Sequence, residues 1–154
     1  MIIRTANIKD IDKILSLDKQ VFELHIKARP DWINKNPQNN DYIKNIIESK
    51  NGKIYVAENE NEIIGYCIIN ICESKNHYIK HDMTNIEIEN MGIDEKYRKK
   101  GIGKKLFEEV KKYAMEINAK FIELSVWEFN QNAKKFYEHM GMKTRINKME
   151  LKIE

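Results

Sequence analysis

The sequence is poor in residues that stabilise a small fold by covalent or metal cross-links. It contains only 2 cysteines, Cys67 and Cys72, in 154 residues, and no set of histidines or cysteines with zinc-site spacing accompanies them. Both lie in one expected strand at an odd separation, so they point to opposite faces and cannot easily form a disulfide. We therefore expect buried thiols rather than ligands or nucleophiles, in a chain long enough to bury a hydrophobic core without cross-links.

Long apolar runs and a large excess of one charge are also missing. No stretch approaches the roughly 20 apolar residues that span a membrane, and the N-terminus lacks the pattern of a secretory signal. The 27 basic and 24 acidic side chains leave a net charge of +3, which does not by itself indicate nucleic acid. The composition predicts one domain, 1–154, located in the cytoplasm, with neither a membrane nor a nucleic acid as partner.

Proline is scarce, and where it occurs it marks a break in regular structure. Both prolines fall in the segment 29–40, which we expect to be a surface loop. Before this loop, apolar residues at helical spacing predict an amphipathic helix that runs to about Lys27, with Asn7 as a possible cap. A second short helix is expected from Asp41.

The rest of the chain alternates between strand and helix patterns. Expected strands cover 2–5, 53–57, 62–72, 84–93 and 120–126, with a final strand or hairpin at 143–153, and expected helices cover 101–117 and 132–139. A helix between two consecutive strands indicates a right-handed crossover and a parallel strand pair. The predicted fold is a single α/β domain with a mixed, mostly antiparallel sheet of about six or seven strands and helices on both faces.

The strongest local signal is the sequence R-K-K-G-I-G at 98–103, between an expected strand and a helix. Its glycines allow a sharp turn, and the unpaired amides at a helix start attract an anion. Lys104 and Lys105 add positive charge at the same place, so a pyrophosphate group fits. The segment lacks the G-K-[ST] of a P-loop and the Rossmann glycine spacing. A tight turn without a ligand is the alternative.

The same segment resembles the acetyl-CoA loop, [QR]-x-x-G-x-[GA], of the GNAT acetyltransferase superfamily. The stretch N-Q-N-A-K-K-F-Y-E-H-M-G-M at 130–142 resembles the second signature of that family, N-x-x-A-x-x-[FL]-Y-x-x-x-G-F, with Met142 in place of the usual aromatic residue. The resemblance implies an N-acetyltransferase that uses acetyl-CoA and no metal. It also implies a splayed central parallel pair, a cofactor-binding core at about 84–142, acceptor-site elements at about 8–50 and 74–83, and a possible homodimer.

The resemblance assigns roles residue by residue. The pyrophosphate would be bound by the backbone of Arg98, Lys99, Lys100, Gly101, Ile102, Gly103 and Lys104. The main chain of Met91 and Ile93 would pair with the pantetheine arm, and the amide of Met91 would face the thioester oxygen. Asn130 and Ala133 would contact the cofactor. Tyr137 would protonate the leaving thiolate, although a core aromatic on an amphipathic helix is the alternative.

The amine must lose a proton before it attacks, and the sequence offers two carboxylates for this step. Glu87 and Glu89 alternate with isoleucines on one expected strand and so share one face. By resemblance Glu87 falls where some family members place a general base, and a strand bulge would favour Glu89 instead. A solvated strand face is the equal alternative.

The acceptor itself is not specified by the sequence. His25, Arg29 and Trp32 belong to a stretch, H-x-x-x-R-P-D-W, that resembles one near the acceptor site of some GNAT proteins. A structural role for His25 is the alternative. The polar loop with His77 and His81 lacks further metal ligands, so we expect a solvated loop there. Two rival functions stay open, a non-catalytic acetyl-CoA-binding or CoA-binding module and a basic nucleic-acid-binding domain.

Overall fold

A single mixed sheet forms the centre of the protein. The structure, a computed structural model, describes residues 1–34 and 40–153. Within these residues the sheet has 5 strands in the order β1 (Ile2–Thr5), β2 (Gly52–Asn59), β3 (Glu62–Ser74), β4 (Met83–Ile93) and β5 (Phe121–Leu124). The first three junctions are antiparallel and the β4/β5 junction is parallel. The expected parallel pair is therefore confirmed, but the expected count of six or seven strands is wrong.

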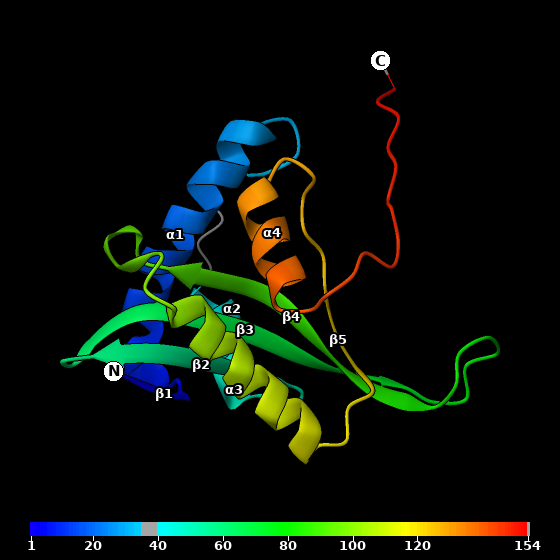
Figure 1. The fold of residues 1–154 in the computed structure, drawn as a ribbon, viewed down its shortest axis with the longest axis horizontal. Coiled ribbons are helices and arrows are strands. Elements are labelled where there is room, and N and C mark those ends of the chain that lie inside the picture. Colours follow the sequence, from blue (N-terminus) through cyan, green and yellow to red (C-terminus); the bar gives the residue numbers. More distant parts are fainter. Residues whose placement is uncertain (35–39, 154) are drawn as a thin grey trace.

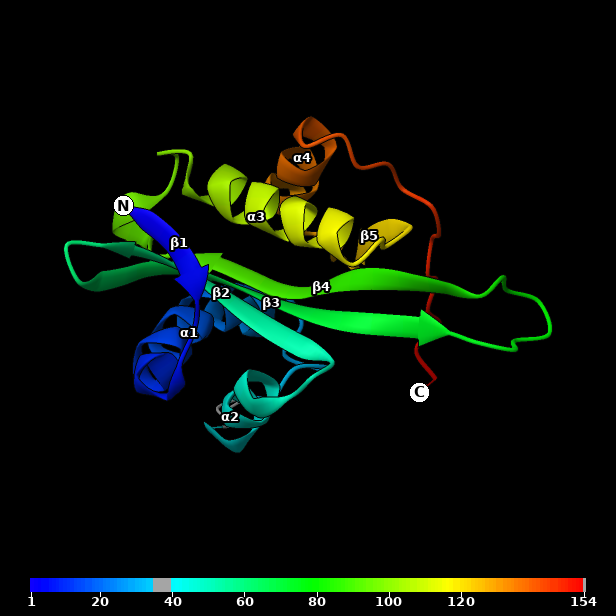
Figure 2. The ribbon, with the colours of Figure 1, turned by 90° about the horizontal axis from the view of Figure 1, so that it is seen from below.

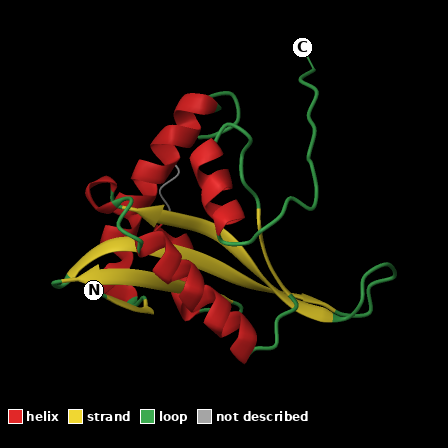
Figure 3. Cartoon of the chain, in the orientation of Figure 1, coloured by secondary structure: helices red, strands yellow, loops and turns green. Residues whose placement is uncertain are grey.

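Helices cover both faces of this sheet. Helices α1 (Ile11–Ala28) and α2 (Asn40–Glu48) lie on one face, and α3 (Ile102–Glu116) and α4 (Gln131–His139) lie on the other (Figures 1 and 2). Figure 2 shows the resulting three-layer order of helix, sheet and helix, and Figure 3 distinguishes the helices from the strands by colour. The helix bounds agree with the expected ones within a few residues, but part of the expected loop at 29–40 lies outside the described residues.

The sheet separates two hydrophobic cores, and β3 contributes to both. Tyr66 and Ile68 pack with α1 and α2, whereas Cys67 and Ile69 pack with α3. Because β3 is covered on both sides, it reads as a nearly continuous apolar run rather than as an alternating one. Each isoleucine that is fully buried in this way contributes about 1.5–3 kcal/mol.

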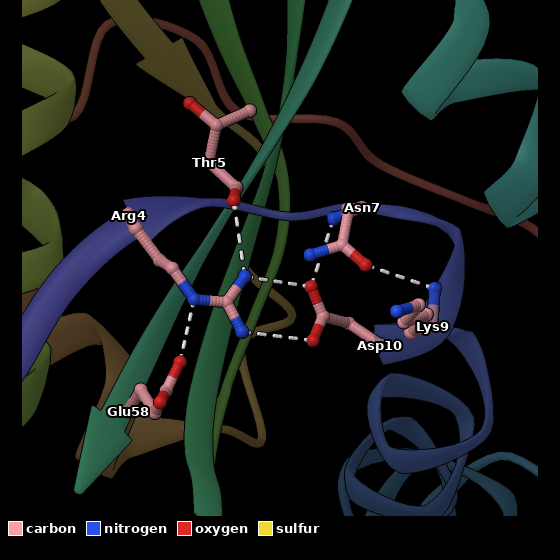
Figure 4. Close-up of polar contacts among 6 residues, drawn as sticks. All are labelled: Arg4, Thr5, Asn7, Lys9, Asp10 and Glu58. Carbon is pink, nitrogen blue, oxygen red and sulfur yellow. Dashed lines mark hydrogen bonds and ion pairs between the residues drawn. The ribbon is translucent and has the colours of Figure 1, made fainter. Parts of the chain in front are cut away.

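The first strand is joined to the rest of the fold by a polar network around Arg4 (Figure 4). The guanidinium donates to both carboxylate oxygens of Asp10, at 2.7 and 2.9 Å, and to Glu58 of β2 at 2.5 Å. Asp10 also accepts from the backbone amide of Asn7 at 2.8 Å, while the side chain of Asn7 caps the short 3₁₀ helix Ile8–Asp10 that leads into α1. The network thus connects β1, β2 and the start of α1 through one charged cluster.

The C-terminal segment departs from expectation. In the described residues, 143–153 form no strand, and the segment leaves α4 as an extended chain (Figure 1). The prediction of a final strand or hairpin there is wrong for this chain alone, because an alternating pattern favours a strand only where a neighbouring strand can supply hydrogen bonds. None of the helices in residues 1–34 and 40–153 combines the length and apolar character required to cross a lipid bilayer.

Candidate functional site at the separation of β4 and β5

The loop between β4 and α3 forms a cradle of backbone amides. Two of its residues have left-handed backbone conformations, Lys99 with φ 61° and Gly101 with φ 78°. The amide of Lys105 bonds to the Gly101 carbonyl at 3.1 Å, and among the described residues the amides of 99–104 find no backbone acceptor. A left-handed conformation is costly for a side chain such as that of Lys99, and such strain is found at functional sites.

A hollow lies directly in front of this cradle. It has a volume of about 320 Å³, and its lining includes Ile93, Arg98 and Gly103 from the loop side and Phe136 and Met140 from α4. A Cβ atom on Gly103 would come within 3.3 Å of the Phe136 ring, so the glycine allows α3 and α4 to approach each other closely. Exposed amides, basic residues and a hollow at a helix N-terminus together form a site suited to a phosphorylated ligand.

The neighbouring strands separate at the same end of the sheet. Pairing between β4 and β5 runs only from Asn85 with Phe121 to Ile88 with Leu124, although β4 continues to Ile93. Opposite β3, the register shifts between Ile68 and Ile69, which leaves Glu89 as an extra residue of β4, a β-bulge. The bulge increases the local bend of β4, and the edge that faces β5 is left without a strand partner beyond Ile88.

The candidate bases lie on the α1 and α2 side of the sheet. Glu89, at the bulge, accepts hydrogen bonds from the hydroxyl of Tyr42 on α2 and from the side-chain amide of Asn70, the latter at 2.6 Å. Glu87 lies 3.9 Å from the thiol of Cys72. Burial and the hydrogen bond to Glu89 raise the pKa of Tyr42, so its hydroxyl stays a donor at neutral pH. Both carboxylates therefore point toward the same face, away from the α3 core.

A third carboxylate, Asp18, was not singled out by the sequence pattern. One of its oxygens accepts hydrogen bonds from Tyr66 of β3 and from Asn90 of β4, both at 2.5 Å. Burial raises the pKa of Asp18, and the hydrogen bond from Tyr66 acts in the opposite direction. The sequence pattern nevertheless marks this residue, because Asp18 lies on the same helical face as the buried Ile14, where an apolar residue is expected.

Asp18 fixes the conformation of β4 next to the bulge. Asn90 directly follows the bulged Glu89 and precedes Met91, the residue expected to face a thioester. Tyr66 pairs with Gly92, where a Cβ atom would lie 2.5 Å from the tyrosine ring. Asp18 therefore holds β4 from the α1 side through both its own strand and its neighbour.

Tyr137 lies on α4, on the opposite side of the sheet from Asp18. Its ring packs against Phe107 and Phe136, with centroid separations of 6.4 and 5.1 Å, and belongs to the same core as Met91. Burial, with Cys67 as a second cause, raises the pKa of Tyr137, so the phenol stays protonated at neutral pH. At the start of the same helix, the side-chain oxygen of Asn130 accepts from the Ala133 amide at 3.2 Å, which makes Asn130 the N-cap of α4.

The residues expected at the acceptor site gather at the end of α1. His25 packs edge-to-face on Phe129 at 5.5 Å and bonds through Nδ1 to the Val21 carbonyl, while Trp32 packs against Trp127 at 6.4 Å. The Arg29 guanidinium lies 5.2 Å from the Trp127 ring and forms ion pairs with Asp31 and with Glu150 of the C-terminal segment. The structure thus brings these three residues together with the loop that follows β5.

Metal ligands do not cluster in the part of the chain that the structure describes: it holds no group of three or more histidine, cysteine, aspartate or glutamate side chains able to bind a metal ion. In the loop between β3 and β4, His77 stacks on Tyr78 at 5.0 Å and accepts from the amides of Ile79 and Lys80 through Nδ1. This histidine therefore has a local structural role in the loop.

Comparisons with known proteins find similar sequences, similar structures and a matching family profile. The chain is 29% identical over 104 residues to an uncharacterized N-acetyltransferase in the pepI 3′ region of Lactobacillus delbrueckii subsp. lactis, and this match covers 68% of the chain and 59% of that relative. It spans less than two thirds of the relative's length.

Solved structures extend the likeness over the whole fold. A crystal structure of a tetramutant of the BH1408 protein from Bacillus halodurans is 30% identical, with a TM-score of 0.94 over 99% of this chain and 100% of that one. The aminoglycoside N-acetyltransferase AAC(6′)-Iy, solved in complex with CoA, shares the fold with a TM-score of 0.74 over 99% of each chain at 13% identity. Residues 18–142 match the sequence profile of the acetyltransferase (GNAT) family, and the chain belongs to that family.

Proposed function

We propose that this protein transfers the acetyl group of acetyl-CoA to a primary amine by direct attack within a ternary complex. The observation that carries the proposal is the cradle of unpaired amides at 99–104, placed beside the point where β4 and β5 separate. When its pyrophosphate binds in the cradle, acetyl-CoA has its pantetheine arm within reach of the unpaired edge of β4. The pantetheine arm would then pair with Met91 and Ile93 like an added strand.

The reaction requires a place for the negative charge that develops on the thioester oxygen. We assign this role to the backbone amide of Met91, which follows the bulge and is held from the α1 side by Asp18 through Asn90. A fixed amide dipole stabilises such an oxyanion without reorganising during the reaction. The amine nitrogen bonds to the carbonyl carbon, the carbon–sulfur bond breaks, and the sulfur leaves as a thiolate.

Two protons must move during this transfer. Tyr137 is assigned as the acid for the thiolate, because its buried phenol stays protonated and belongs to the same core as Met91. On the opposite face, Glu89 is assigned as the acceptor of the amine proton, directly or through water, with Glu87 as the alternative. The hydrogen bonds from Tyr42 and Asn70 favour Glu89, because they hold its carboxylate at the bulge beside the reacting strand.

Calorimetric titration with acetyl-CoA, followed by a free-thiol assay over a panel of amines, tests this function. The panel holds one peptide N-terminus, a lysine derivative, a polyamine, an amino acid and an aminoglycoside, each compared with acetyl-CoA hydrolysis in the absence of amine. Saturable binding with thiol release on one amine class supports the enzyme and names its acceptor. Binding with no release on any amine would favour a non-catalytic acetyl-CoA sensor, and no binding would overturn the site assignment.

A further inference from the structure

A single arginine at the end of α1 binds two carboxylates. The Nε and Nη2 atoms of Arg29 donate to the two oxygens of Asp31, both at 3.0 Å. Its Nη1 and Nη2 atoms donate to the two oxygens of Glu150, at 2.6 and 3.1 Å. Paired hydrogen bonds to one carboxylate are the arrangement by which a guanidinium recognises this group most specifically. Arg29 therefore presents two complete carboxylate-binding edges.

The two carboxylates are attached to the protein in different ways. Asp31 is a local partner, two positions from Arg29, and it fixes the direction of the guanidinium. Glu150 lies 121 positions away on the C-terminal segment 143–153, and its side chain is 63% exposed. Within the described residues, no backbone-to-backbone hydrogen bond joins this segment to the rest of the chain. Because an exposed ion pair contributes little stability, another carboxylate can replace Glu150 without disturbing the fold.

Aromatic rings pack against the same guanidinium. The Cζ atom of Arg29 lies 5.9 Å from the centroid of the Trp32 ring and 5.2 Å from that of Trp127. Trp127 in turn stacks on Phe129 at 5.7 Å, and Trp32 is 64% exposed. The cation–π contacts hold the guanidinium in place when one carboxylate leaves, and the exposed ring offers an apolar surface to the rest of a ligand.

One face of α1 connects this cation to the reacting strand. His25 follows Asp18 by about two helical turns and Arg29 follows by about one more, which places all three on one face. Asp18 bonds to Asn90 of β4, and His25 packs on Phe129 of the loop after β5. From Asp18 to Arg29 the chain advances roughly 16 Å along the helix axis. A ligand that reaches from β4 to Arg29 is therefore longer than a free α-amino acid, in which the amine and the carboxylate share one carbon atom.

We propose that Arg29 binds a carboxylate of the acceptor, and that Glu150 occupies this position in the absence of the acceptor. This inference rests on the proposed function and names its substrate class, an amine with a carboxylate several bonds away, as in a short peptide with a free C-terminus. The amine lies at Glu89, while the carboxylate bonds to the edge of Arg29 that Glu150 leaves. Polyamines and aminoglycosides carry no group for this edge.

The C-terminal segment is placed to act as this internal competitor. Figure 2 shows it passing from the side of α4, past the sheet, to the side on which α1 and α2 lie. Its ion pair between Arg145 and Glu123 of β5, at 2.6 Å, directs it along this path. The segment therefore delivers the carboxylate of Glu150 to the acceptor side without covering the cradle at the start of α3.

Tryptophan fluorescence tests the carboxylate site without any acetyl transfer. The chain contains 2 tryptophans, and both lie against Arg29, so an exchange of carboxylates at the guanidinium should change the emission. The full chain with bound CoA is titrated with dipeptides and tripeptides that carry either a free C-terminal carboxylate or a C-terminal amide. At least one free acid should bind at least about tenfold more tightly than its amide. The assignment is overturned if no acid binds more tightly than its amide.

Two variants separate recognition from competition. Arg29→Gln should bind the acid and the amide equally, because it removes the charge and the paired donors. Glu150→Gln removes the competitor, so the acid should bind at least about threefold more tightly while the amide binds as before. The matched control is the exposed Glu116→Gln, which changes the net charge equally and should leave both affinities unaltered. A preference for the acid that survives in Arg29→Gln, or unchanged acid binding in Glu150→Gln, would overturn the proposal.

The thiol-release assay separates this proposal from the activity on which it rests. Tighter binding of the free acids with no acetyl transfer to any amine would keep the carboxylate site and remove the proposed activity. Acetyl transfer to polyamines or peptide amides as efficient as transfer to the free acids would keep the activity and overturn the carboxylate site.

Discussion

Asp18 connects two neighbouring strands beside the candidate site through a single carboxylate. One oxygen accepts from both Tyr66 and Asn90, and these donors belong to neighbouring strands. Helical periodicity places an aspartate on the buried face of α1, but it cannot show which distant donors the aspartate meets. The partners are separated from Asp18 by 48 and 72 positions, so only the folded structure reveals these hydrogen bonds.

Replacing Asp18 should lower stability in an order set by hydrogen bonding. Asp18→Ala leaves two donors without an acceptor and should cost about 1–3 kcal/mol for each group that stays buried and unsatisfied. Asp18→Asn retains one oxygen acceptor and should cost less. Urea unfolding measures both, with the exposed Glu23→Gln on the same helix as the control. Equal stability of the alanine variant and the wild type would show that the hydrogen bonds to Asp18 do not stabilise the fold.

Tyr137 should affect turnover far more than binding. Tyr137→Phe keeps the ring packing against Phe107 and Phe136 but removes the proton donor, so kcat should fall by about 10²-fold or more. The dissociation constant of acetyl-CoA, measured by calorimetry, should change little. If the variant keeps full activity across the pH range, the acid role is wrong and the tyrosine has a packing role only.

At the scale of elements, the two parts of the site differ in how far the sequence predicts them. The loop at 98–103 is contiguous, and its glycines, charges and position before a helix are all readable. The bulge at Glu89 depends on the register between β3 and β4, which no local pattern specifies. The alternation at 149–153 predicts a strand, but a strand needs a neighbour, and within the described part of this chain none is supplied.

The cradle at the start of α3 can be tested by charge at constant size. Gly101 has a φ of 78°, and a Cβ atom added there would meet no atom within 4 Å. Asparagine and aspartate both tolerate this backbone conformation better than other side chains. Gly101→Asn should therefore bind acetyl-CoA with modest loss. Gly101→Asp places a negative charge beside the pyrophosphate and should bind at least about tenfold more weakly than the asparagine variant.

Calorimetry on both variants measures this difference, and the salt dependence separates its causes. An electrostatic loss should shrink as the ionic strength rises, because the carboxylate is exposed to solvent. If asparagine and aspartate weaken binding equally at low salt, the backbone conformation matters at this position and the anion does not. Equal wild-type binding in both variants would remove the cradle assignment altogether.

At the scale of the whole molecule, a polar network attaches the start of α1 to the edge of the central sheet. Two cores lie on opposite faces of one sheet, and the network around Arg4 ties β1, β2 and the start of α1 together (Figure 4). The side chain of Asp10 is 8% exposed, and its carboxylate accepts from the Arg4 guanidinium and from the Asn7 backbone amide. Its loss should loosen the attachment of α1 to the edge of the sheet.

The ion pair between Arg4 and Asp10 should make the free energy of unfolding fall as the pH is lowered. The hydrogen bond from Arg4 is the largest cause that lowers the pKa of Asp10 in the folded state, whereas an unfolded aspartate has a pKa of about 3.9. The unfolded state therefore takes up the proton first, and the contribution of Asp10 is complete above that value and lost as the pH falls through the folded pKa. Asp10→Asn lacks this contribution at every pH.

Urea unfolding of both proteins should show a stability difference that is constant from pH 7 to about pH 5 and shrinks at lower pH, while the exposed Glu108→Gln should show no such trend. A difference independent of pH would mean that Asp10 acts through the shape of the turn rather than through its charge.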